Sequence, residues 1–332
     1  MNAHLVVSSF FVFLLVHTVA AQPKLQGGEE TGQTPPVVAH AGETSKQSLM
    51  SRIGVAEVAV RQAESAHAAN GDLSKRYILL GLLYQDAAEW EKSETVLMHA
   101  VSLARKNSES AGDLALAISQ LGSVHVLMGK LRDSEKEDEE ALKIRQSIGD
   151  PLDIARSRSD LAILYLAKQN YGKARIFAQE AEIEIATNER AIAMDRIVAR
   201  ITLSEALCHL RECPSAIPLL KAALEEAKVT MHPTDLTLGV SEFLLGYGYW
   251  KSGEMSRAEE YLRQGAELMS ARLGWGHPAY VTALRQYAQF LHEDQQVEAA
   301  NAVERRIRQS EAVVDVHSIQ RAQGMFSLDG LR

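Results

Sequence analysis

The chain has 332 residues, of which 46% are hydrophobic, so it can bury a large core. Its net charge is −8, and its only basic cluster is Arg305, Arg306 and Arg308, which argues against a nucleic-acid surface. Ala, Leu, Glu, Arg and Gln dominate and there are only 8 prolines, so we expect an all-α protein.

Residues 1–21 have the pattern of a secretory signal peptide. An apolar run from Leu5 to Val16 is followed by small residues, and cleavage is expected after Ala20 or Ala21. No Lys or Arg precedes the run, and His17 ends it before the ~20 residues that a membrane span needs. We therefore expect an exported chain, periplasmic or secreted, without a membrane span after cleavage. An uncleaved N-terminal membrane anchor is the alternative.

Two segments precede the main body of the chain. Residues 22–48 are rich in Gly, Gln, Thr and Pro and show no helical period, so a flexible linker is predicted there. Apolar residues at helical spacing begin at Leu49. Residues 49–71 are predicted to form a leading helix that caps the open end of the main body.

A sequence repeat with a period of about 42 residues occupies residues 72–310. In each copy a Leu or Tyr precedes a small residue, and another small residue follows twelve positions later. The first small residues are Gly81, Gly122, Ala162, Ser204, Gly246 and Ala288, and the second are Ser93, Ser134, Ala174, Ala216, Ala258 and Ala300. Such a period predicts a solenoid in which each unit buries its apolar face against its neighbours.

Each repeat is predicted to contain two antiparallel helices. In the fifth copy they cover residues 234–251 and 255–272, separated by a break around Gly253. Pro278 then begins the next helix, because proline suits the first turn of a helix. Small residues recur seven apart on the second helices, which lets the two helices of a pair approach closely.

These residues closely resemble the tetratricopeptide repeat. Its large residue, three positions after the first small residue, is present as Tyr84, Tyr165 and Tyr249, whereas His125 fills that slot in the second repeat. Residues 273–278 are similar to a joint of the forty-two-residue variant found in kinesin light chains and bacterial relatives. Asp138 and Glu304 depart from the family, which has a bulky apolar residue at their position. The resemblance implies a right-handed superhelical solenoid of six repeats plus the leading helix.

The resemblance also implies a binding surface, the concave groove of the array. In tetratricopeptide proteins the groove is lined by first-helix residues that flank the packed positions. The corresponding positions here are Arg156, Ser159, Glu205, His209, Phe243, Tyr247, Trp250, Arg285, Gln289 and His292.

The fifth repeat carries three aromatic residues at these positions. Phe243, Tyr247 and Trp250 are spaced i, i+4, i+7 and so share one face of a helix. Exposed together, and with Arg285 from the next repeat, they could hold an apolar helix or an extended peptide. The alternative is that they pack against the neighbouring first helices.

Cys208 and Cys213 are the only cysteines. In an oxidising compartment they could form a disulfide across the turn between two helices. Alternatively, Cys208 is a small packing residue and Cys213 a turn residue. A metal site with His209 is the weakest interpretation, because a fourth ligand is missing.

No catalytic pattern is found in the chain. Phosphate-loop, dinucleotide, zinc-protease and nucleophile-elbow motifs are all missing, and the histidines are scattered. We expect no enzyme activity, cofactor or metal. The favoured function is a non-catalytic protein–protein interaction scaffold that binds an unknown protein, helix or peptide. A regulatory sensor of a small ligand or signalling peptide and a structural part of an envelope or secretion assembly are the alternatives.

The C-terminal tail, residues 311–332, has a different composition from the repeats. It is predicted either to fold back onto the last helix pair or to be a disordered end from Gly324 onward.

Overall fold

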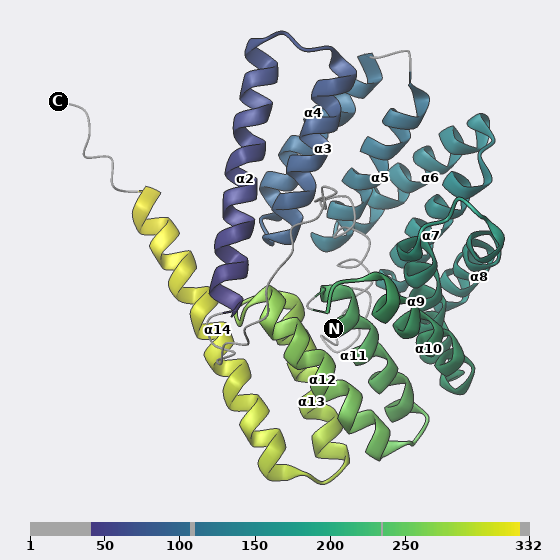
Figure 1. The fold of residues 1–332 in the computed structure, drawn as a ribbon, viewed down its shortest axis with the longest axis vertical. Coiled ribbons are helices and arrows are strands. Elements are labelled where there is room, and N and C mark those ends of the chain that lie inside the picture. The colour runs from purple at the N-terminus through teal and green to yellow at the C-terminus, as the bar shows by residue number, and fades with distance from the viewer. Residues whose placement is uncertain (1–40, 107–109, 234, 326–332) are drawn as a thin grey trace, which may run out of the picture.

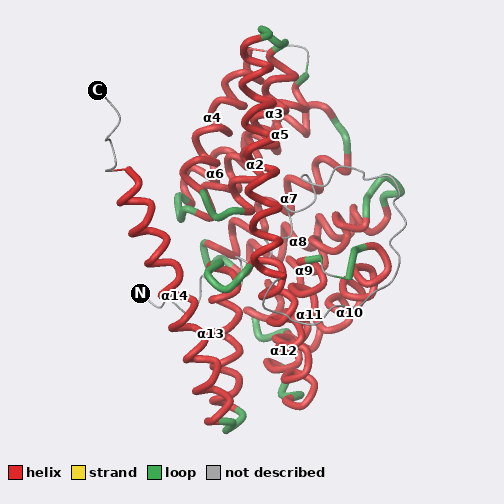
Figure 2. Tube along the Cα trace, turned by 60° about the vertical axis from the view of Figure 1, so that its left-hand side comes forward, coloured by secondary structure: helices red, strands yellow, loops and turns green. Residues whose placement is uncertain are grey.

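The computed structural model describes residues 41–106, 110–233 and 235–325, and the regular elements in these ranges are all α-helices (Figure 1). A leading helix, α2 (Ala41–Ser65), comes first. Six pairs follow: α3 (Asn70–Asp86) with α4 (Trp90–Lys106), α5 (Ala111–Leu127) with α6 (Leu131–Ile148), α7 (Pro151–Ala167) with α8 (Tyr171–Thr187), α9 (Ala193–His209) with α10 (Cys213–Thr230), α11 (Leu236–Lys251) with α12 (Met255–Leu273), and α13 (Pro278–Glu293) with α14 (Val297–Met325). The predicted all-α solenoid of helix pairs is confirmed, and short loops join most of the helices (Figure 2).

Side-chain caps begin several of the first helices. The Asp150 carboxylate accepts a hydrogen bond from the Leu152 amide, and Pro151 occupies the first turn of α7. His277 and Pro278 begin α13 in the same way, as the sequence predicts. These groups satisfy amides that have no partner inside the helix.

The small residues lie where the two helices of a pair cross. A Cβ atom added to Gly246 would lie 2.6 Å from the Leu262 amide nitrogen, so α11 and α12 approach too closely for a side chain there. Ser93 donates a hydrogen bond to the Gly81 carbonyl across the first pair. The six residues twelve positions after the steps are all 0% exposed: Ser93, Ser134, Ala174, Ala216, Ala258 and Ala300. The repeated small residues therefore serve packing.

The turn inside each pair has one geometry in all six repeats. The large residue of the repeat, such as Tyr84, lies near the end of the first helix, and its carbonyl accepts a hydrogen bond from the amide five residues later. The residue before that amide has a positive φ, for example 55° at Ala88 and 84° at Gly253. This is the Schellman arrangement, which satisfies carbonyls at the end of a helix.

The first helices of the pairs form the inner layer of the array. Each of α3, α5, α7 and α9 contacts the next first helix as well as its own partner. The array also curls round so that α2 contacts α12 of the fifth pair (Figure 1). At this contact, burial raises the pKa of Asp86 to about 7, while Arg52 and Arg272 act to lower it. The molecule is thus a curved array whose fifth unit returns to its first helix.

The two ends differ from the sequence-based boundaries. The leading helix begins at Ala41, inside the segment predicted as a linker. At the other end, α14 is one continuous helix to Met325, so the described part of the predicted tail extends the last pair. The predicted signal peptide, residues 22–40 and residues 326–332 lie outside the described residues. Among the helices that the structure describes, none is long and apolar enough to cross a membrane.

Candidate functional site

The predicted exposed aromatic stripe of the fifth repeat is wrong for two of its three members. Phe243 is 0% exposed and lies where α11 crosses α12, so close that a Cβ on Gly265 would be 2.5 Å from its amide nitrogen. Trp250 is 5% exposed, and its indole N–H donates to Glu293 of α13 at 2.8 Å. It also packs edge-on against Phe290, with ring centroids 5.8 Å apart. These rings are core residues because α12 and α13 cover the helix face that carries them.

Tyr247 is the half-buried member of that predicted stripe. Its ring lies edge-on to Trp250 at 5.7 Å, and the Lys251 ammonium lies 5.5 Å from its centroid. Burial, followed by the charge of Glu205 on α9, raises the pKa of Tyr247 to about 12. Glu205 thus acts electrostatically on Tyr247, and the helices that carry them, α9 and α11, are in contact.

Glu205 is a buried carboxylate without a hydrogen-bond partner among the described residues. Its side chain is 1% exposed, and both of its oxygens are unpaired. Burial raises its pKa to about 8. The nearest basic atom is Nε2 of His209, one helical turn away and 3.9 Å from Oε1, beyond hydrogen-bond distance.

His209 stacks face to face on Tyr171 of α8, with ring centroids 4.2 Å apart and planes 5° from parallel. Burial lowers the pKa of His209 to about 4, so at neutral pH it carries no charge to balance Glu205. The Tyr171 hydroxyl is also buried without a partner in the part of the chain that the structure describes. Glu205, His209, Tyr171 and Tyr247 together are named the acidic-aromatic cluster.

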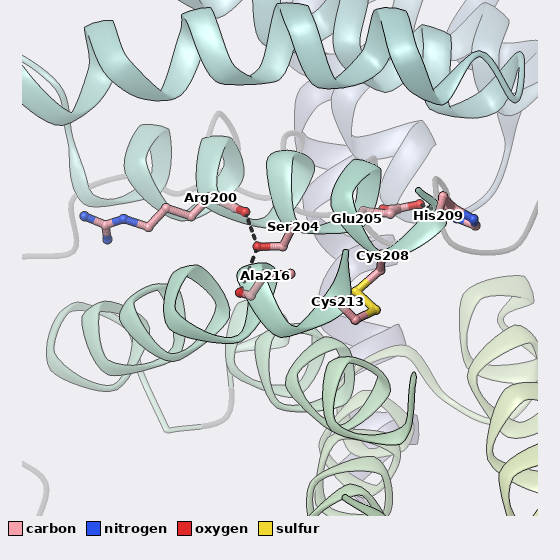
Figure 3. The surroundings of a disulfide bond; sticks show 7 residues. All are labelled: Arg200, Ser204, Glu205, Cys208, His209, Cys213 and Ala216. Atoms are coloured by element: carbon pink, nitrogen blue, oxygen red, sulfur yellow. Dashed lines mark hydrogen bonds and ion pairs between the residues drawn. A yellow bond between two sulfur atoms is a disulfide. The ribbon is translucent and has the colours of Figure 1, made fainter. Parts of the chain in front are cut away.

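Cys208 and Cys213 form a disulfide that joins the end of α9 to the start of α10. Figure 3 shows Glu205 and His209 along α9, with the disulfide directed toward α10. The bond therefore fixes the last turn of the helix that carries the two cluster residues. This is the first of the three interpretations that the sequence offered for the two cysteines. The described residues contain no group of acidic, histidine and cysteine side chains that could hold a metal ion.

The third-repeat groove residues are engaged within the array. Arg156 donates two hydrogen bonds to Asp195 of α9, at 2.9 and 2.8 Å, and a third to Asp153. Ser159 is 6% exposed, and its hydroxyl has no partner within the described ranges. Arg156 thus ties α7 to α9, and neither residue is a freely exposed contact.

The three sixth-repeat groove residues lie together on α13, beside α14. Arg285, Gln289 and His292 line one open pocket of about 440 Å³ between α13 and α14, together with Glu293 and Glu304. Each is held by an acid: Arg285 by Glu311, Gln289 by Glu293 at 3.1 Å, and His292 by Glu304 at 2.8 Å. The pocket is therefore polar at its rim and already paired in charge.

Sequence reasoning missed Tyr171 and Glu293. Both lie outside the first-helix positions that the repeat pattern marks, and Tyr171 comes from a second helix. Glu205 was selected by its groove position in the repeat. A second signal also marks it: it is the only charged residue from Ile201 to Cys208, in a helix segment that is otherwise apolar or small. A charge in such a run is a sign of function, because burying it is unfavourable.

The comparisons with known proteins agree with this fold. A family model described as "Tetratricopeptide repeat" matches residues 113–182, which extend from α5 into α8. The Rap conjugation gene regulator of the plasmid pLS20, in complex with the Phr* peptide, is similar with a TM-score of 0.65 and 15% identity, over 99% of this chain and 88% of that one. A Rap protein complexed with Competence and Sporulation Factor has a TM-score of 0.57 and 14% identity, over 85% and 89%.

BtubC (BKLC) from P. vanneervenii is also similar, with a TM-score of 0.51 and 19% identity, over 74% of this chain and 95% of that one. No curated protein sequence matches the chain. At these identities the structural likenesses show the fold.

Proposed function

We propose that this tetratricopeptide-repeat protein is a non-catalytic scaffold that binds an extended segment of a protein or peptide partner on the inner face of its helix array. The observation that supports this most is the acidic-aromatic cluster, in which Glu205 is buried without a partner among the described residues. A buried carboxyl group without a partner destabilises the fold, and a bound ligand could supply the missing partner. Two similar solenoids are described in complex with the Phr* peptide and with Competence and Sporulation Factor.

The test is to find which helices a partner protects. The chain from residue 22 is used to capture partners, and fragments of each partner are added back during hydrogen exchange. A bound segment is expected to slow exchange in α9, α11 and α13, and Tyr247→Ala is expected to weaken capture. Ile176→Ala is the matched control, since Ile176 is 55% exposed on α8. The proposal would be contradicted if only other helices were protected, or if Tyr247→Ala and Ile176→Ala lost partner capture equally.

A sensor of a small ligand or short peptide is the second candidate. It is favoured by the pocket lined by Arg285, Gln289 and His292, which belongs to a single helix pair. A ligand that binds Arg285 or His292 in place of Glu311 or Glu304 would break the contacts between α13 and α14 and so alter the angle between these helices. A ligand that protects only these two helices in hydrogen exchange would favour this function over the scaffold.

We also propose that the chain is exported and cleaved after Ala20 or Ala21. The disulfide between Cys208 and Cys213 supports this, because such bonds persist in oxidising compartments. Cell fractionation followed by mass spectrometry of the N-terminal peptide tests it. A chain that keeps residues 1–21 in the cytoplasmic fraction would contradict it.

A further inference from the structure

Glu205 differs from the other deeply buried acids of the protein in lacking a cation nearby among the described residues. Asp160 pairs with Arg145 at 3.6 Å, and the same arginine acts on Asp138. Asp86 feels both Arg52 and Arg272. Burial alone accounts for the raised pKa of Glu205, and His209 beside it is uncharged at neutral pH. The protein thus supplies a counter-charge to its structural acids but not to Glu205.

The surroundings of Glu205 suit a positively charged group. Tyr171 stacks on His209, whose Nε2 lies 3.9 Å from Glu205 Oε1, and the charge of Glu205 acts on the pKa of both Tyr171 and Tyr247. Tyr171 and Tyr247 are half-buried, whereas the His209 side chain is 11% exposed and the Glu205 side chain 1% exposed. The two tyrosines therefore form the more exposed rim of the cluster. Aromatic faces attract ammonium and guanidinium groups, and a desolvated carboxylate pairs with them through charge-assisted hydrogen bonds.

We infer that the acidic-aromatic cluster is a subsite for one cationic group, a lysine or arginine side chain or a terminal amine, of the peptide bound on the inner face. The inference rests on the proposed peptide-binding function and adds its specificity. The cation would enter past Tyr247 and Tyr171 and pair with the unpaired oxygens of Glu205. The unpaired Tyr171 hydroxyl would turn its oxygen toward the same cation.

Binding of a cation has a proton signature in this site. With a pKa of about 8, most Glu205 carboxyls are protonated at pH 7, and a cation favours the ionised form. The facing groups do not titrate near pH 7, because burial lowers the pKa of His209 to about 4 and raises the pKa of Tyr247 to about 12 and of Tyr171 above its usual value. Glu293, which also acts on Tyr247, is held by Trp250. Binding at pH 7 should therefore release close to one proton from Glu205.

The experiment uses the chain from residue 22 and pools of labelled hexapeptides with Arg or Lys fixed at one position. Matched pools carry citrulline or norleucine there, which keep the shape and remove the charge. We expect at least tenfold tighter binding of a cationic pool at one position, and loss of that preference in Glu205→Gln. Glu225→Gln, on a 71% exposed acid of α10, should keep it. Calorimetry in buffers of different ionisation enthalpy should show proton release in the parent and none in Glu205→Gln.

The outcomes separate this inference from the proposed function. Pools that bind equally well with and without the cation, or a cation preference that survives in Glu205→Gln, would overturn the subsite while leaving peptide binding intact. If no peptide pool, protein segment or fragment binds, the proposed function is contradicted as well. If N-acetylarginine amide or spermidine alone binds in a Glu205-dependent way, a small amine replaces the peptide as the ligand. Tyr247→Ala, on the rim, provides the same comparison if Glu205→Gln loses its melting transition.

Discussion

At position 138 an aspartate occupies the place that Leu97 and Leu262 occupy in the first and fifth repeats. Each of the three contacts the glycine of its repeat: a Cβ on Gly122 would lie 2.6 Å from Asp138 Oδ1, just as one on Gly81 would lie 2.7 Å from Leu97. Burial, and then the neighbouring Asp160, raise the pKa of Asp138 well above its usual value. The packing pattern therefore accepts an acid at a core position, with a cost in stability.

Replacing this acid by the leucine that the first, fourth and fifth repeats carry at this position should stabilise the protein. Asp138→Leu is expected to raise the free energy of unfolding by about 1–3 kcal/mol at pH 7, because it removes a buried acid and fills the same space. The gain should grow from pH 4 to pH 8, since the unfolded aspartate ionises in that range more readily than the folded one. Urea unfolding measures it. Asp133→Leu, at an exposed site on α6, should change stability by less than about 0.5 kcal/mol. A lower midpoint for Asp138→Leu would contradict the prediction.

Glu205 should show the same sign of pH dependence. Its folded pKa of about 8 lies above the unfolded value of 4.5, so the native state holds its proton more tightly and loses stability as pH rises between these values. Glu205→Gln is expected to raise stability by about 1–2 kcal/mol at pH 7 and by almost nothing at pH 4. Thermal melts at the two pH values, with Glu225→Gln as control, check this. A destabilised Glu205→Gln at pH 7 would show that the carboxylate has a structural partner.

At the residue scale, the groove positions of Glu205 and His209 stay predictions, whereas Phe243 and Trp250 were wrongly placed on an exposed surface. Helical spacing gives the direction of each side chain around its own helix. It does not say which neighbouring helix covers that direction. The Phe243 backbone lies against α12 and the Trp250 ring packs on α13, and only the packing of the helices decides that both residues are buried. For the same reason, the contribution of Tyr171 from a second helix was invisible in the sequence.

Only some of the turns inside the helix pairs carry a residue from which the turn can be predicted. Gly129 and Gly253 occupy the positive-φ position in two repeats, and the break around Gly253 was predicted from the sequence. The other four turns have the same geometry but place Ala, Gln or Arg at this position: Ala88, Gln169, Arg211 and Gln295. Only the even spacing of the repeats located those four, because their residues carry no turn signal.

These four turns store strain that glycine would relieve. A non-glycine residue in the left-handed region is disfavoured by roughly 1–2 kcal/mol, partly offset because glycine is more flexible when unfolded. We expect Gln169→Gly and Gln295→Gly to raise stability by about 0.5–1 kcal/mol each, and Gly253→Ala to lower it by about 1 kcal/mol. Chemical denaturation of the single variants tests this. If Gln169→Gly instead destabilised the protein as much as Gly253→Ala, the contacts of the Gln169 side chain would outweigh the backbone strain.

Over the whole molecule, the buried acids and the buried histidines make stability depend on pH in opposite directions. Glu205, Asp86 and Asp160 have folded pKa values of about 8, 7 and 6. Each therefore lowers the stability of the folded state as pH rises from its unfolded pKa to its folded pKa. His209 and His277, both with pKa values of about 4, destabilise it when pH falls below 6.5, because the unfolded rings then take up protons. Between pH 4 and 6.5 the two sets oppose each other, and above pH 6.5 mainly the acids act, so we expect the melting temperature to fall as pH rises from 6.5 to 8. A pH series of calorimetric scans measures it, and a maximum at pH 8 or above would contradict the assignment.

The contact between α2 and α12 has a consequence for how the array comes apart. In an open solenoid each unit touches only its neighbours, so the ends fray first and unfolding can spread unit by unit. Here the first helix and the fifth pair hold each other, with Asp86 between Arg52 and Arg272. Units two to four therefore lie within a closed circuit and cannot loosen without breaking contacts far away in sequence. The contact between α2 and α12 therefore affects the stability of every unit that lies between these two helices.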